Sequence, residues 1–426
     1  MSPAEPGGVS TDIDTPTETA ATPSPGAGHR PGTWPYVRIV AALFVAGLAT
    51  FALLYSTQAV LPDLAAAFGL TSGASTLAVS VTTAGLGVAL LVAGPISDRW
   101  GRTALIHTSL AASAVVAGLC ALAPTWPALL GLRFAEGVVL AGLPAVATAY
   151  LREELHPASQ ARAAGLYIGG TALGGMTGRL LTGAVVDAAG WRWSLGAAAL
   201  LGVVCAVAVR LLLPASRRFE PVARGEAGLW TLFRAAWSDR VLVGLYLIGG
   251  LAMGAQVATF NMIGFRLTAA PFGLSLAAVS LLFCVYPVGS VSSMVAGRLA
   301  DAFGYRAVLP IGSLIAIAGL ALTLSGSLPV IVVGLALVVA GFFVVHGVAS
   351  AWVPVRAYAA GIATAQAASL YLFSYYLGSS VFGTLAGTAY GAFGWCGVVG
   401  ENAALFVGVG VLAYFLKHSE ALPARG

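Results

Sequence analysis

Charge is scarce in this sequence. Only 9% of the 426 residues are Asp, Glu, Lys or Arg, whereas a soluble domain has roughly 25%. This scarcity excludes a soluble globular enzyme. Lys417 is the single lysine among 21 basic residues, and no basic stripe with interleaved aromatic residues occurs. The formal net charge of +5 therefore does not indicate a nucleic-acid partner.

Cysteine and catalytic motifs are also scarce. The four cysteines lie far apart, in or beside apolar runs, without C-x-x-C spacing: Cys120, Cys205, Cys284 and Cys396. We interpret them as packing residues, with no metal or redox site. The phosphate loop G-x-x-x-x-G-K-[S/T], the zinc motif H-E-x-x-H and the nucleophile elbow do not occur. We expect no enzyme activity and no cofactor.

Long apolar runs dominate what is present, and 58% of the residues are hydrophobic. A membrane-spanning helix needs about 20 consecutive apolar residues. Runs of this kind predict an all-α integral membrane protein with twelve spans, near 38–61, 74–97, 104–123, 127–150, 162–186, 193–213, 241–264, 276–297, 307–326, 329–352, 366–388 and 398–416.

The basic residues predict how these spans are oriented. If the N-terminus is cytoplasmic, seventeen of them fall on the cytoplasmic side and only Arg192 and Arg266 on the other, while Arg133 and Arg179 lie within spans. Cytoplasmic loops of membrane proteins carry the excess of Lys and Arg. We therefore predict a multi-pass protein of the plasma membrane with both termini in the cytoplasm.

The polar segments divide the chain into five parts. Residues 1–37 are rich in Thr, Pro, Ala and Gly and are expected to form a disordered cytoplasmic tail. Residues 38–213 and 241–416 form two six-helix bundles, and 417–426 is a second cytoplasmic tail. The central loop, 214–240, is interpreted as a solvated tether with an amphipathic surface helix, or alternatively as a regulatory site.

The two bundles are related by an internal repeat. GPISDRWGR recurs as GRLADAFGYR at an offset of 203, and LYIGGTALGGMTGRLLTG recurs as LYLFSYYLGSSVFGTLAG at an offset of 204. Each member of the second pair is followed by Gly-Trp, at Gly190 and Gly394. Two segments with nearly the same offset indicate a duplicated six-span unit. Such repeats are typical of secondary transporters.

The first repeated segment resembles the loop signature of the major facilitator superfamily, Gly-x-x-x-Asp-Arg-x-Gly-Arg. This resemblance implies two pseudo-symmetric six-helix bundles, the major facilitator fold, and a gating role without substrate contact. From the residues alone, the segment is either an ionic latch between the halves or a turn with ordinary positive-inside charges. The matching positions are Gly94, Asp98, Arg99, Gly101 and Arg102, with a partial second copy at Gly297, Asp301, Gly304 and Arg306.

The fourth span contains a charged pair. Arg133 and Glu136 are three residues apart, so both lie on one helical face. Arg133 and Gly137 resemble a family motif, Arg-x-x-x-Gly, that is associated with proton coupling in drug exporters. We hypothesise that Glu136 binds and releases the transported proton while Arg133 tunes it. The alternative is a permanent salt bridge that only holds helices together.

The fifth span is rich in glycine, which lets helices approach closely. Gly170, Gly174 and Gly178 resemble the antiporter signature of the superfamily, Gly-x-x-x-Gly-Pro-x-x-Gly-Gly. Two positions depart from it, because Gly175 replaces Pro and Arg179 replaces the last Gly. The side chain of Arg179 either holds an anionic group of the substrate or pairs with a carbonyl or carboxylate of the protein.

Other polar and aromatic residues are candidates for a central substrate cavity, which the resemblance places among spans one, four, seven and ten with contributions from five, eight and eleven. They are Tyr55, Gln58, Tyr167, Arg179, Gln256, Asn261, Tyr371 and Tyr375. His346, in the tenth span, is either a packing residue or a second candidate for proton coupling.

Further segments resemble a bacterial subgroup of arabinose-efflux-like or drug:proton antiporter-like transporters: YLREELHP (150–157), FNMIGFRL (260–267) and ASLYLFSYYLGSS (368–380). The predicted function is proton-coupled efflux of a small drug-like molecule or sugar, with the proton gradient as energy source. Proton-driven uptake is the alternative, and an intramembrane enzyme or receptor is a remote one. The expected partners are the substrate and the lipid bilayer, and the protein is expected to be monomeric.

Overall fold

The computed structural model describes residues 28–216, 219 and 228–417, which fold mainly as α-helices. Ten helical segments in this part are long and apolar enough to cross a membrane. Two of them, α7 (Pro157–Leu212) and α14 (Thr364–Lys417), are about twice the length of a span and fold back at a glycine with positive φ, Gly190 (76°) and Gly394 (61°). The ten segments therefore make twelve crossings, which confirms the predicted fold class.

The first half runs from α1 to α7 and the second from α9 to α14, with α8 between them. The first half contains α1 (Trp34–Leu54), η1 (Gln58–Val60), α2 (Leu61–Phe68), α3 (Ser72–Trp100), α4 (Arg102–Ala121), α5 (Trp126–Leu140), α6 (Gly142–Glu154) and α7. The remainder is α8 (Leu229–Ser238), α9 (Arg240–Thr268), α10 (Leu276–Ser280), η2 (Leu281–Val285), α11 (Pro287–Phe303), α12 (Tyr305–Leu322), α13 (Leu328–Ala360) and α14.

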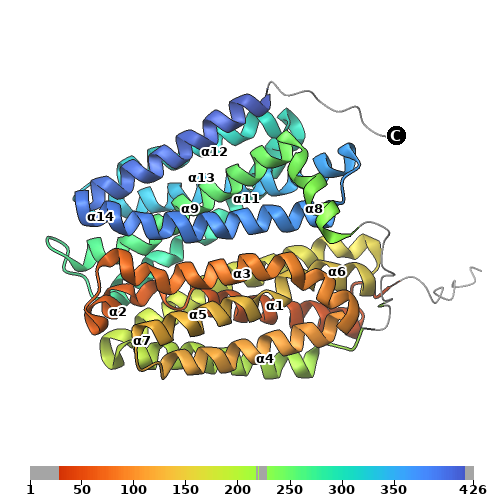
Figure 1. The fold of residues 1–426 in the computed structure, drawn as a ribbon, viewed down its shortest axis with the longest axis horizontal. Helices are drawn as coiled ribbons and strands as arrows, with labels where there is room; N and C mark the ends of the chain where they lie inside the picture. The colour runs from red at the N-terminus through yellow and green to blue at the C-terminus, as the bar shows by residue number, and fades with distance from the viewer. Residues whose placement is uncertain (1–27, 217–218, 220–227, 418–426) are drawn as a thin grey trace, which may run out of the picture.

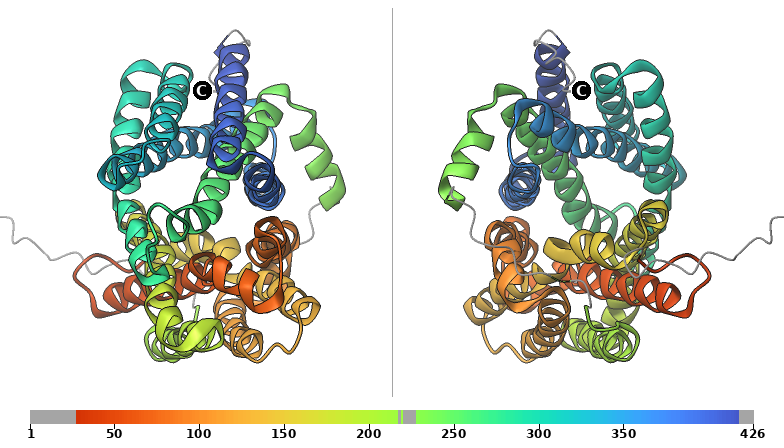
Figure 2. Two further views of the ribbon diagram at one scale, coloured as in Figure 1. Left: turned by 90° about the vertical axis from the view of Figure 1, so that its left-hand side faces the viewer. Right: turned by 90° about the vertical axis from the view of Figure 1, so that its right-hand side faces the viewer.

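The halves form two layers, with the first half below the second in Figure 1. Within each half a central span packs along its partner, α1 along α7 and α9 along α14, while α3 packs against α14 across the two layers. We call the end where α1 begins and α14 ends the terminus side, and the end with Gly190 and Gly394 the far side. Figure 2 shows the halves end-on, with α8 at the edge.

Equivalent backbone positions confirm the duplication. Gly101 and Gly304, at the sequence offset of 203, have nearly the same conformation, with φ of 87° and 83° and ψ of 151° and 152°. Each residue ends one span and begins the next, in a conformation that only glycine adopts without strain. Gly190 and Gly394 likewise occupy the same place in their halves.

Large apolar side chains are exposed on the outer faces of α4, α12 and the second parts of α7 and α14. Among those more than half exposed are Val115, Leu122, Leu200, Leu314 and Phe415. An apolar surface of this extent is unfavourable in water and favourable against lipid. These helices therefore form the lipid-facing perimeter, and the helices that carry the site are enclosed between them.

The structure moves one predicted boundary. Helix α1 begins at Trp34, four residues before the expected start of the first bundle, because Pro35 suits the first turn of a helix. Residues 28–33, assigned to the tail 1–37, include His29, which pairs with Leu155 at the end of α6. Helix α8 lies within the predicted central loop 214–240. Residues 1–27 and 418–426, most of both predicted tails, lie outside the described residues.

Candidate functional site

Two buried amides join the halves on the far side. The Gln58 Nε2 atom, just beyond the end of α1, donates to Oδ1 of Asn261 in α9 at 2.7 Å. The two residues are 203 positions apart, which is the offset of the sequence repeat. Equivalent residues of the two halves therefore meet, and the pseudo-twofold axis of the molecule passes between them.

Each amide is held by the helix that packs along the central span of its own half. Arg179 Nε in α7 donates to Gln58 Oε1 at 2.6 Å, and Asn261 Nδ2 donates to the carbonyl of Gly383 in α14 at 3.2 Å. Arg179 and Gly383 are also related by the repeat, at the offset of 204. The result is a buried four-residue chain that crosses the interface, with a charged side chain at one end and a backbone carbonyl at the other.

Arg179 lies in an aromatic cage. Its guanidinium carbon is 4.1 Å from the ring centre of Tyr55 in the first half, and 4.9 and 4.8 Å from those of Phe283 and Tyr286 in the second. Arg179 Nη1 also donates to the carbonyl of Gly175 at 2.7 Å. The side chain is only 2% exposed, so ring faces and neutral oxygens surround the charge.

Two further contacts close the far side. The carboxylate of Asp187, in α7, accepts hydrogen bonds from the backbone amides of Leu276 (3.2 Å) and Ala277 (2.8 Å), and so caps the N-terminus of α10 in the other half. In the symmetry-related position, Gly387 of α14 lies against Gly73 of α3 with no room for a side chain. Deeper along the same pair of helices, Thr384 donates to Ser80 at 2.8 Å.

The terminus side differs from the far side in its polar contacts. Within the part of the chain that the structure describes, the polar contacts of the gating motif stay inside the first half: Arg102 pairs with Asp98 at 2.7 Å and with Glu153 of α6 at 3.0 Å. In the second copy, Arg306 donates to the carbonyl of Lys417, within the second half. The described hydrogen bonds between the halves run from the far side to mid-span, so the far side is the closed side.

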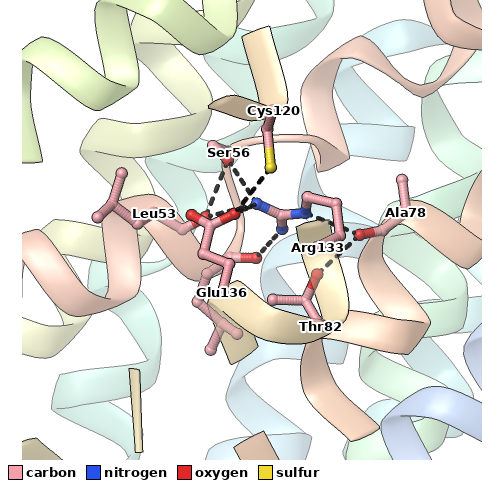
Figure 3. Close-up of polar contacts among 8 residues, drawn as sticks. Leu53, Ser56, Ala78, Thr82, Cys120, Arg133 and Glu136 are labelled. Carbon is pink, nitrogen blue, oxygen red and sulfur yellow. Dashed lines mark hydrogen bonds and ion pairs between the residues drawn. The ribbon is translucent and has the colours of Figure 1, made fainter. Parts of the chain in front are cut away.

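Arg133, in α5, occupies the junction of three helices (Figure 3). Its Nε donates to the carbonyl of Ala78 in α3, and its Nη1 and Nη2 donate to the carbonyls of Leu53 and Leu54. These last two carbonyls lie at the C-terminal end of α1, where a helix leaves its acceptors unsatisfied and carries negative partial charge. Arg133 therefore caps α1 and binds it to α3 and α5.

Glu136 is the ionic partner of Arg133. Its Oε2 atom is 2.7 Å from Arg133 Nη1 and 3.6 Å from the sulfur of Cys120, which donates to it. The two side chains are 0% and 1% exposed, and the second carboxylate oxygen of Glu136, Oε1, has no hydrogen-bond partner. The predicted pair is thus formed, buried, and provided with one oxygen that a proton can occupy without breaking an existing bond.

The glycine candidates pack helices closely. Cβ atoms added to Gly170, Gly174 and Gly178 would overlap the backbone carbonyls of successive turns of α1, at Phe44, Leu48 and Ala52. Gly137, next to Glu136, has the same relation to the carbonyl of Thr82 in α3. These glycines allow α1, α3, α5 and α7 to hold the buried polar groups at short range.

A second group of candidates lies in the other half. His346 Nδ1 is 2.9 Å from the hydroxyl of Tyr371, and its ring stacks at 5.7 Å and 4° on Phe342 and lies 4.7 Å from Tyr375. Of the remaining candidates, Gln256 donates to Tyr286 at 3.4 Å, whereas Tyr167 is buried in the apolar core of the first half.

Four residues that the sequence interpretation missed take part in these contacts: Phe283, Tyr286, Phe342 and Asp187. The three aromatic residues lie in apolar runs, where a cage residue has the same pattern as a core residue. The sequence did hold a clue to the role of Asp187, because an isolated acid at the end of the fifth span is well placed to cap a neighbouring helix.

Two repeated six-helix halves that meet on a polar axis are the architecture of a membrane transporter. The chain belongs to the Major Facilitator Superfamily, whose family model matches residues 40–283. As predicted, it is a transporter and not an enzyme.

Two relatives support this family assignment, and two solved structures share the fold. The chain is 40% identical over 398 residues to the MFS-type transporter YybF of Bacillus subtilis (strain 168), covering 93% of this chain and 97% of the relative. It is 41% identical over 381 residues to the inner membrane transport protein YnfM of Escherichia coli (strain K12), covering 89% and 90%. In fold it resembles an inward-facing bacterial homologue of the human lysosomal transporter Spinster, with a TM-score of 0.72, 18% identity and coverage of 92% and 96%. It also resembles the nucleoside transporter NupG, with a TM-score of 0.69, 15% identity and coverage of 89% and 99%.

Proposed function

We propose that the protein exports a small organic molecule across the bacterial plasma membrane in exchange for protons, and that its terminus side is cytoplasmic. The described ends of the spans support this orientation, because Arg99, Arg102, Arg298 and Arg306 lie on the terminus side and Arg192 and Arg266 on the far side. In this orientation the structure is inward-facing, ready to take a solute from the cytoplasm.

The Arg133–Glu136 pair carries the proposal. Arg133 caps α1 at Leu53 and Leu54, only four residues before Gln58, which holds the axis contact to Asn261. Protonation of Glu136 removes the negative charge that fixes one arm of Arg133. Because Arg133 also bonds the end of α1, the proton alters the support of the far-side contact.

The direction of exchange rests on the glycine array of α7. Gly170, Gly174 and Gly178, which resemble the antiporter signature, let α7 pack closely against α1 over three successive turns. Because the α1–α7 pair is rigid, a displacement of α1 at Arg133 reaches Arg179 and Gln58 and is not absorbed by local bending. This geometry supports a gate that a proton opens from one side and a solute from the other.

Transport by everted membrane vesicles tests the proposal. A panel of growth inhibitors is first screened with and without overexpression to find a protected compound, and its uptake into acid-interior vesicles is then measured. Wild type should accumulate the compound, and an uncoupler should abolish the accumulation. Glu136→Gln should lose the response to the pH gradient but retain exchange of labelled for unlabelled compound.

Glu401→Gln is the matched control. Glu401 is a carboxyl of α14 with no ion pair among the described residues, and both its oxygens are enclosed without a hydrogen-bond partner. We expect this variant to keep proton-driven accumulation. Gradient-driven transport that survives in Glu136→Gln would overturn the role of Glu136, and protection against no compound would overturn export.

A further inference from the structure

We propose, building on the transport function above, that the solute is a small aromatic carboxylate and that Arg179 binds its carboxylate group. The inference rests on the charge of Arg179, on its free hydrogen-bonding edge and on the aromatic rings around it.

The first argument is charge balance. Of the two arginines within spans, Arg133 is neutralised by Glu136. The described structure has four ion pairs, and none of them includes Arg179. A buried guanidinium without a counter-ion is costly in a membrane. Because Arg179 lies on the interface that opens and closes, a transported anion can supply the missing charge, whereas a transported cation would add to the repulsion.

The second argument is geometry. The guanidinium has five N–H groups in a fork that matches a carboxylate. Arg179 uses Nε for Gln58 and one N–H of Nη1 for Gly175, while Nη2 donates no hydrogen bond within the described residues. The contacts between the guanidinium and the three rings are weaker than a bidentate bond to a carboxylate. An arriving carboxylate can therefore replace them.

The replaced contacts include those that hold the far side closed. Phe283 and Tyr286 belong to the second half, whereas Arg179 belongs to the first. Binding of a carboxylate to Arg179 removes the attraction between its guanidinium and these rings and so favours separation of the halves on the far side. Recognition of the anion and opening of the exit are in this way the same event.

The third argument is the chemistry of the surroundings. Tyr55, Phe283 and Tyr286 enclose Arg179, and Phe260 packs on the latter two with ring centres 5.5 and 5.1 Å apart. Rings prefer to pack with other rings in offset or edge-to-face geometry. A ligand with an aromatic body beside its carboxylate fits these surfaces.

The hydrogen-bond chain does not by itself require a charge at this position. The counterpart of Arg179 in the second half is Gly383, whose carbonyl accepts from Asn261, whereas Arg179 donates to Gln58 Oε1. A neutral donor would satisfy the same oxygen of Gln58. The charge of Arg179 is therefore an addition that this contact does not require.

Equilibrium binding to the purified full-length protein in detergent tests the inference without any gradient. Its outcome therefore does not depend on whether transport is coupled to protons. Three probes of nearly equal size are compared by isothermal titration: 1-naphthoate, 1-naphthamide and 1-naphthylmethylammonium. Wild type should bind naphthoate at least tenfold more tightly than either of the others. Arg179→Gln should reduce naphthoate affinity to that of the amide without changing amide affinity, and Arg179→Lys should retain part of the preference.

Arg192→Gln is the control, because this guanidinium lies over Trp191 on the far side and bonds the carbonyl of Ala123, away from the interface. It should keep the wild-type preference. Equal affinity of wild type for naphthoate and naphthamide, tighter binding of the ammonium, or no binding of naphthoate would overturn the proposal. So would an acid preference that persists in Arg179→Gln. The wild-type comparison stands even if a variant does not fold.

Discussion

The backbone contact between Gly387 and Gly73 predicts that one methyl group changes which side of the transporter is open. A Cβ added at Gly387 would overlap the Cα of Gly73, which is backbone and cannot rotate away. Helices α14 and α3 must therefore separate in Gly387→Ala. Because these helices belong to different halves, the overlap exists only while the far side is closed.

The size of the effect follows from the cost of overpacking, about 1–3 kcal/mol. A cost paid in one state alone shifts a two-state equilibrium by about 5- to 150-fold. If the closed state were favoured about tenfold, 2 kcal/mol would leave it only about 25% populated. The gain in helix propensity from Gly to Ala, about 1 kcal/mol, applies to both states and cancels.

Disulfide formation across the far side measures this population. Ser80 Oγ and Thr384 Oγ1 lie 2.8 Å apart across the interface, so the pair Ser80→Cys and Thr384→Cys should crosslink only in the closed state. The four native cysteines are first replaced. The crosslinking rate should fall severalfold in Gly387→Ala.

Gly391→Ala is the matched control, because a Cβ at Gly391 meets nothing within 4 Å and the residue lies on the same helix. It should leave the rate unchanged. Equal crosslinking rates in Gly387→Ala and Gly391→Ala would show that the glycine contact does not limit closure, and the steric argument would be wrong.

Three further predictions concern stability and closure. Gly174→Ala should lower the thermal unfolding midpoint, since it forces α7 from α1 at a cost of about 1–3 kcal/mol, whereas Gly169→Ala, with nothing within 4 Å, should raise or preserve it; equal midpoints would contradict the packing role. Asp187→Ala removes the two hydrogen bonds that Asp187 accepts from the start of α10, each worth about 0.5–1.5 kcal/mol, and should slow the same crosslink; an unchanged rate would remove Asp187 from the closing contacts. Burial raises the pKa of Asp239, but hydrogen bonds from Arg356 and the Leu242 amide outweigh it and bring the pKa below its usual 3.8. The carboxylate therefore stabilises the fold above about pH 4, and this contribution is lost as the pH falls through the lower folded-state pKa; Asp239→Asn should flatten the acid limb of the unfolding midpoint, and a parallel limb would contradict the ion pair.

The sequence was sufficient for the features that depend on local pattern. Apolar runs predicted the spans, the repeat predicted two related halves, and the spacing of Arg133 and Glu136 predicted a pair on one helical face. The pairing of Gln58 with Asn261 was within reach, because both were candidates and their separation equals the repeat offset. It was missed because the offset does not say which residues face the axis.

Other features depend on information that one sequence does not hold. The aromatic cage of Arg179 combines residues from spans one, five and eight, and their approach depends on how the two bundles are tilted. The side on which the molecule is closed is a choice between two states of the same chain. A single sequence encodes both states, so the pattern of residues alone cannot indicate which one is observed.

The break after α1 has a consequence for symmetry. Helix α1 ends at Leu54 with Arg133 on its last carbonyls, whereas its counterpart α9 runs without interruption from Arg240 to Thr268. The second half has no arginine in the matching position, where the repeat offset falls on Ala336 or Leu337. Because the axis that relates the halves runs along the membrane normal, an exact duplication would make both halves bend in the same way when the transporter opens and closes. With a joint after α1 and none in α9, the bending at this level is confined to the first half.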